Sequence, residues 1–295
     1  MKTQKTFSKL ALLWLASVFL TLLSFISGAP FFRVLRENYG AKIFWISALV
    51  TVFTLDMVGA QALSLIIGAV WMIVGVYYEL EVRGVKWWSA AWISIGLSAA
   101  FSVVQSAFLM RQAEITNSEQ LLKAAHRIIE QINTLYPQLK LNSETIMYQI
   151  PSGFLAILIF ALGLSIIGGP AVSRWFNLSW VRRAGHVRGL EFRVPDYLIW
   201  FGLIGLLLML VDFKSVALSV LGSSLINILT AVYFFQGLAI FEVFLIAIRA
   251  GPFTRLLSYF LIVGNLFFIL SLIGFIDFWI DFRRRLRKLK PVSNT

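Results

Sequence analysis

Residues 216–248 read VALSVLGSSLINILTAVYFFQGLAIFEVFLIAI, a stretch whose one charged side chain is that of Glu242. A helix needs about 20 mostly apolar residues to cross the hydrocarbon layer of a bilayer, which is ~30 Å thick. The stretch exceeds that length, and it is too apolar to lie on the surface of a soluble protein. It therefore indicates a segment that spans a membrane.

Seven further runs share this apolar character. They are Leu10–Phe25, Ile43–Leu55, Leu63–Leu80, Trp87–Met110, Phe154–Ile167, Leu198–Val211 and Leu256–Ile280. Hydrophobic residues make up 59 % of the 295 residues and charged residues only 14 %, which agrees with an integral membrane protein. The sequence thus predicts an all-α, polytopic transmembrane helix bundle of about eight spans, with one extramembrane amphipathic helical segment.

We expect one membrane domain, because little chain is left for a second. Its predicted parts are N-terminal transmembrane helices over 1–110, an extramembrane amphipathic segment over 111–148, C-terminal transmembrane helices over 149–282 with a basic loop at 174–193, and a basic tail over 283–295.

The segment 111–148 carries apolar residues at the three- and four-residue spacing of an amphipathic helix. These are Leu121, Leu122, Ala125, Ile128, Ile129, Ile132 and Leu135. Pro137 ends the pattern, because proline disfavours the helical conformation of the residue before it. We predict a helix over Ser118–Tyr136 that packs its apolar face on the membrane surface or on the bundle.

The formal charge of +12 comes from basic residues at span ends. They cluster at Lys2, Lys5 and Lys9, between Arg174 and Arg193, and between Arg283 and Lys290. Such clusters favour the cytoplasmic side. We therefore expect a multi-pass protein of the bacterial inner membrane with both termini and the 174–193 loop in the cytoplasm, and with the neutral 111–148 segment outside.

Two runs allow more than one path, because each forms either a hairpin of two short helices or a crossing plus a re-entrant piece. Ile43–Leu80 is interrupted at Asp56, Gly59 and Gln61, and Val216–Ile248 at Asn227, Gln236 and Gly237. With both termini inside, the number of crossings must be even. An external 111–148 segment then favours a single net crossing for Ile43–Leu80 and a double crossing for Val216–Ile248. A short polar connection, Arg33–Lys42, is expected between the first two runs.

The sequence lacks the residues that several classes of activity require. The chain has no cysteine and two histidines, neither of them at zinc-ligand spacing, and it has no nucleotide-binding glycine loop. We therefore expect no enzyme, no metal, no cofactor and no ATP site. A nucleic-acid partner is not expected either, because no soluble domain is available to bind one.

Polar side chains within apolar runs are costly, so they are candidate ligand-binding residues. They are Asn227, Gln236, Glu242, Asp56 and Gln61. Asp56 and Gln61 flank a helix break, which is either a loop at the membrane surface or the lining of a polar cavity.

The three later candidates lie on one predicted helix. Asn227 and Glu242 fall about 60° apart on it and Gln236 on the opposite face, so only a turn near Gln236 brings all three together. Arg249 is close enough along the chain to reach Glu242. Asp277 and Asp281 are expected to meet Arg284 and Arg285 at the membrane edge.

The C-terminal half resembles a known family. The resemblance rests on Arg182-Arg183, on Phe192-Arg193-Val194-Pro195 with Tyr197 and Trp200, on Asn227 followed by Phe235-Gln236-Gly237-Leu238-Ala239, and on Gly274-Phe275-Ile276-Asp277 with Phe282-Arg283. This order is similar to that of the YybS-like family, an uncharacterised group of polytopic bacterial membrane proteins. In outline the family is also similar to the substrate-binding membrane subunits of energy-coupling-factor transporters.

These features lead to two functional hypotheses. The first is a small-molecule-binding or transport component in the lipid bilayer, with energy supplied by membrane or ATPase partner subunits. The alternative is a non-transporting scaffold or partner-binding subunit of a cell-envelope complex. Polar side chains that converge on one cavity favour the first, and polar side chains at helix–helix contacts favour the second.

Overall fold

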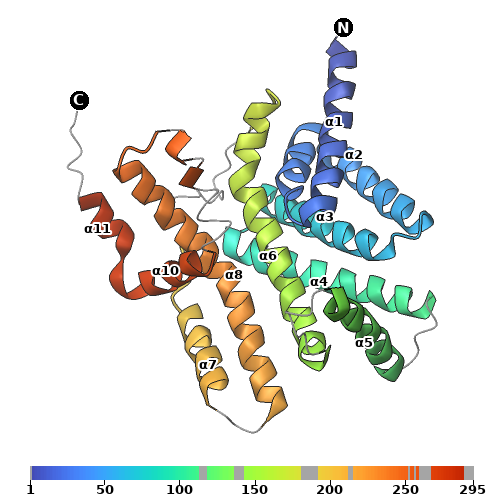
Figure 1. The fold of residues 1–295 in the computed structure, drawn as a ribbon. Helices are drawn as coiled ribbons and strands as arrows, with labels where there is room; N and C mark the ends of the chain where they lie inside the picture. The colour runs from blue at the N-terminus through green and yellow to red at the C-terminus, as the bar shows by residue number, and fades with distance from the viewer. Residues whose placement is uncertain are drawn as a thin grey trace. The chain divides into compact units, whose positions relative to one another are not determined.

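The computed structural model describes residues 2–112, 118–135, 143–180, 192–211, 215–251, 253–255, 257–258 and 267–288. All regular structure in these ranges is helical, so the all-α prediction is confirmed (Figure 1). The helices are α1 (Lys2–Ser24), α2 (Ala29–Met57), α3 (Gln61–Val82), α4 (Trp87–Gln112), α5 (Ser118–Leu135), α6 (Ser143–Trp175), α7 (Leu198–Leu210), α8 (Val216–Ala247), α10 (Phe267–Ile280) and α11 (Phe282–Lys288).

Within the described ranges, five helices are long and apolar enough to cross a membrane, namely α2, α3, α4, α6 and α8. Shorter apolar helices are the Ser8–Ser24 part of α1, α7 and α10. The chain forms two compact units, residues 1–186 and residues 187–295, which we call unit 1 and unit 2. The expectation of a single membrane domain stays a prediction.

The Ile43–Leu80 run contains a hairpin of two helices. α2 ends at Met57 and α3 begins at Gln61, with Gly59 between them at φ +79°. Only glycine adopts this left-handed conformation without strain. Of the two paths considered, the structure shows the hairpin of two helices, with Phe44 and Trp45 of α2 against Gly75 of α3. The number of times that this run crosses the membrane stays a prediction.

The Val216–Ile248 run behaves in the opposite way. It forms one continuous helix, α8, and the double crossing expected for it is wrong. The reason lies at Gly237, where a Cβ atom would overlap the backbone of Leu270 in α10. Gly237 is therefore a site of close helix packing, and its conformation does not turn the chain.

The polar connection expected at Arg33–Lys42 is also wrong. Residues from Ala29 onward are helical, and the chain bends at Gly40, which has φ +84°. Arg33 is buried in spite of its charge. Hydropathy misses this helix because the charges of Arg33 and Arg36 are matched by Glu81 and Glu79 of α3.

One end of unit 1 is defined by contacts between segments far apart in sequence. Lys9 Nζ of α1 donates to the carbonyl of Phe176, just after α6, at 3.0 Å. Asn38 accepts a hydrogen bond from Ser179 at 2.8 Å, and Arg36 Nε donates to Glu79 at the same distance. We call this end, where α1 begins and where α3 and α6 finish, the Lys9 end.

The amphipathic segment is helical where it is described, which confirms that prediction for Ser118–Leu135. Ile129 is buried and α5 packs on α6. Leu135 is 73 % exposed, so the membrane surface is its expected contact. The side chains of Leu121, Leu122, Ala125, Ile128 and Ile132 lie outside the described residues, as do Tyr136 and Pro137.

Candidate functional site

Helices α7, α8 and α10 of unit 2 line a half-open cavity of about 320 Å³. It is lined by Gly202 and Leu206 of α7, by Ile226, Leu229, Thr230 and Tyr233 of α8, and by Phe268, Ser271, Leu272 and Phe275 of α10. The lining is almost wholly apolar, with hydroxyl groups on Thr230, Ser271 and Tyr233. A cavity of this size falls in the range that holds small-molecule ligands.

Glycine residues bring these three helices close together. A Cβ atom on Gly202 would meet the ring of Phe275 at 2.6 Å, and one on Gly205 would meet Leu225 at 3.2 Å. Small residues at helix contacts allow such an approach in membranes. Two large rings of the cavity wall, Tyr233 and Phe275, pack edge to face with centroids 5.2 Å apart.

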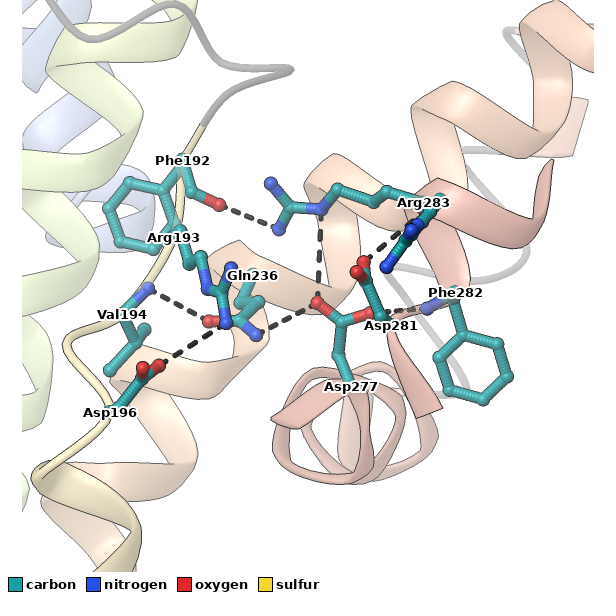
Figure 2. Close-up of polar contacts among 10 residues, drawn as sticks. Phe192, Arg193, Val194, Asp196, Gln236, Asp277, Asp281, Phe282 and Arg283 are labelled. Carbon is teal, nitrogen blue, oxygen red and sulfur yellow. Dashed lines mark hydrogen bonds and ion pairs between the residues drawn. The ribbon is translucent and has the colours of Figure 1, made fainter. Parts of the chain in front are cut away.

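Gln236 lies one turn beyond Tyr233 and forms the centre of a polar cluster (Figure 2). Its side chain is 3 % exposed. The backbone N–H of Val194 donates to Gln236 Oε1 at 2.9 Å, and Gln236 Nε2 donates to Asp277 Oδ2 at 3.1 Å. One amide group thus connects the segment before α7 with α8 and α10.

Asp277 is the acidic member of the cluster and is also buried. Its Oδ1 accepts from the backbone N–H of Phe282 at 2.8 Å, and Arg283 Nε lies 3.9 Å from its Oδ2. Arg283 Nη2 in turn donates to the carbonyl of Phe192 at 2.6 Å. The buried carboxylate is compensated by donors and a cation, as burial of a charge requires. Asp277 pairs with Arg283, so the expectation that it meets Arg284 or Arg285 is wrong. Asp281 does meet Arg284, because its Oδ1 accepts a hydrogen bond from the backbone N–H of that residue at 3.4 Å.

The continuous α8 keeps the other two candidates of this helix away from Gln236. Asn227 is half-buried about 13 Å back along the helix axis. Glu242 forms a half-exposed ion pair with Arg255 at 3.5 Å, whereas the sequence suggests Arg249 as its partner. Neither residue, nor Gln236, lines the cavity between α7, α8 and α10. Their role in ligand binding stays a prediction.

Asp56 and Gln61 flank the α2–α3 turn of unit 1, as the sequence predicts. Both are half-buried. Asp56 Oδ1 is shielded from solvent and has no hydrogen-bond partner among the described residues. The turn therefore has a feature of each alternative. It is a short loop between two helices, and it carries a buried carboxylate oxygen, as the lining of a polar cavity would.

Sequence reasoning misses the ion pair of Arg33 and Glu81. Arg33 Nη2 donates to Glu81 Oε2 at 2.6 Å, and the guanidinium lies 5.5 Å from the ring centroids of both Tyr77 and Trp180. A Cβ atom on Gly169 would meet the Trp180 ring, so this glycine makes room for the stack. The sequence does hold a signal, because two acids, Glu79 and Glu81, and two arginines, Arg33 and Arg36, lie at the ends of apolar runs. The sequence does not show that the helices carrying them are in contact.

The described residues contain no group of three His, Cys, Asp or Glu side chains suited to a metal ion. In comparisons with known proteins, residues 7–278 match the family model described as "Predicted membrane protein (DUF2232)". No curated protein and no solved structure matches the chain. The matched range covers both the cavity and the polar cluster up to Asp277.

Proposed function

The chain belongs to the family "Predicted membrane protein (DUF2232)", and from that premise we propose that it binds an apolar or amphipathic small molecule drawn from the bilayer. The cavity between α7, α8 and α10 is the proposed binding site. ATP-driven transport of the ligand would depend on a partner subunit, because the sequence has no ATP-binding motif.

The observation that carries this proposal is the composition of the cavity wall. Seven of its ten residues are leucine, isoleucine, phenylalanine or glycine on the faces of three apolar helices, and Ser271 already donates its hydroxyl to the Phe267 carbonyl at 3.1 Å. A lining of this kind favours a hydrocarbon chain, since apolar burial contributes about 25 cal/mol per Å². We expect the hydroxyl of Thr230, which lines the cavity, to bond a single polar group on such a ligand.

The polar cluster around Gln236 favours the scaffold alternative. Its amide and carboxylate groups bond across helices and to the segment before α7, which is the pattern expected of polar groups used for packing. A scaffold needs no ligand in the cavity. The two functions therefore differ in whether a molecule occupies the space between α7, α8 and α10.

Kinship with the YybS-like family, and in outline with energy-coupling-factor substrate-binding subunits, agrees with a binding component that relies on partner subunits. The same proposal includes a location in the inner membrane and the absence of enzymatic activity.

Native mass spectrometry of the purified protein tests the proposal directly. We expect the wild type to retain a small molecule, and a Thr230→Phe variant, which fills the cavity, to lose it by ~10-fold or more. Leu207→Phe is the matched control, because Leu207 is exposed and does not line the cavity. A wild type that retains nothing, or a Thr230→Phe variant that retains as much as the control, contradicts ligand binding and favours the scaffold.

A further inference from the structure

A second polar site lies in unit 1, where the end of α2, the start of α3 and the last third of α4 meet. Gln105 Nε2 of α4 donates to Ser64 Oγ of α3 at 3.2 Å, and Ser64 Oγ donates to the Val52 carbonyl of α2 at 3.4 Å. Ser64 is fully buried. Three helices are thus linked by a short chain of polar groups.

Two oxygen atoms of this region are buried without a hydrogen-bond partner among the described residues. They are Asp56 Oδ1 and Gln105 Oε1. Gln105 Oε1 faces α3, since a Cβ atom on Gly68 would lie 3.4 Å from it. Asp56 lies one turn beyond Val52 and so shares the helix face that Ser64 contacts.

Both of these atoms are hydrogen-bond acceptors. An amide oxygen has no proton to give, and an ionised carboxylate accepts only. Their burial is unfavourable unless a donor or a cation binds them. Asp56 makes no ion pair with any lysine or arginine in the part of the chain that the structure describes. A cation would satisfy both acceptors at once and would also balance the charge of the carboxylate.

We propose that Asp56, Ser64 and Gln105 form a binding site for a monovalent metal cation, with sodium as its ligand. Their carboxylate, hydroxyl and amide oxygens are the donors that hard cations prefer. The single carboxylate matches one positive charge, whereas divalent sites draw on more acidic ligands. The carboxyl end of α2 adds its partial negative charge, and helix breaks with exposed carbonyl groups bind cations in other membrane proteins.

The site is tested by thermal unfolding of the purified wild type in sodium chloride and in N-methylglucamine chloride at equal ionic strength. We expect sodium to raise the unfolding temperature in a saturable way, because a ligand that binds only the folded state stabilises it. Equilibrium binding of radioactive sodium to the wild type provides a readout that does not depend on any variant.

Variants locate the effect. We expect Asp56→Asn and Gln105→Met to raise the sodium concentration at half-effect by ~10-fold or more. Asp196→Asn is the control, because Asp196 is an exposed carboxylate of unit 2, and it should respond as the wild type does. The proposal is overturned if the wild type responds equally to both salts, if it responds only to pH, or if Asp56→Asn keeps the wild-type response.

Discussion

Arg33 and Glu81 are a charged pair whose side chains are 1 % and 2 % exposed. Removing one partner of such a pair leaves a buried charge and costs about 3–5 kcal/mol. We expect Glu81→Gln to lower the free energy of unfolding by about that amount, measured by denaturant unfolding in mixed micelles.

The neighbouring pair provides the control. Arg36 and Glu79 are 12 % and 29 % exposed, so Glu79→Gln should cost only about 0–1 kcal/mol. The Arg33→Leu/Glu81→Leu double variant should recover most of the loss, because it removes both charges. A double variant as unstable as Glu81→Gln would show that packing, and not the uncompensated charge, causes the loss.

A second contrast lies within α8, between Gln236 and Glu242. Gln236→Leu leaves the Val194 N–H and an Asp277 oxygen without their bonded partner, so we expect a loss of about 2–4 kcal/mol in the free energy of unfolding. Glu242→Gln removes a half-exposed ion pair and should cost about 0–1 kcal/mol. Equal losses of unfolding free energy in the two variants would contradict the role of Gln236 as a buried side chain that links α8 to α10 and to Val194.

At the scale of elements, two glycines with similar sequence surroundings have different structural roles. Gly59 and Gly237 each sit beside polar residues in a long apolar run. Gly59 turns the chain at φ +79°, whereas Gly237 lies within the continuous helix α8 and packs against α10. The hydropathy pattern predicts the apolar runs, but it cannot distinguish a turn glycine from a packing glycine, since that depends on the helix opposite.

The packing role of Gly237 gives a prediction about α8 and α10. A Cβ atom there would overlap the Leu270 backbone, so Gly237→Ala should lower the free energy of unfolding by about 1–3 kcal/mol. Gly96 in α4 has no neighbouring atom within 4 Å of such a Cβ, and Gly96→Ala should be neutral or stabilising by up to about 1 kcal/mol. Thermal unfolding of both variants is the measurement, and a neutral Gly237→Ala would contradict the close crossing.

The sites show the same limit of sequence reasoning. Asp56 and Gln236 stand out because polar groups in apolar runs are expensive. The partners of Gln236, which include Asp277 and the backbone of Val194, are distant in sequence. The sequence places Arg33 in a polar connection because its compensating charge, Glu81, lies 48 residues away. Burial of a charge can be predicted only when its partner is known.

At the scale of the molecule, the contacts within unit 1 show whether each helix runs toward the Lys9 end or away from it. α1 begins at the Lys9 end, and the first half of α2 returns there, where Arg36 meets Glu79. The second half of α2, then α3, α4 and α6, run alternately away from this end and back. The α2–α3 turn, the end of α4 and α5 accordingly lie at the opposite end, as the Gln105–Ser64 bond indicates.

This path supports the predicted orientation. Basic residues gather at the Lys9 end, among them Lys9, Arg83, Lys86 and Arg174, and such residues favour the cytoplasm. We therefore expect the N-terminus and residues 174–180 to be cytoplasmic, and α5 to lie outside.

Cysteine accessibility measures this orientation cleanly, because the natural chain has no cysteine. Ser173 is a poor position, since it is buried and its hydroxyl bonds the Leu178 carbonyl at 2.9 Å. Trp175 is 80 % exposed, and Gln131 in α5 is exposed as well. We expect an impermeant maleimide to label Gln131→Cys in intact cells and to label Trp175→Cys only after permeabilisation. The reverse pattern would invert the topology, and labelling of both in intact cells would refute the alternating path of α2, α3, α4 and α6.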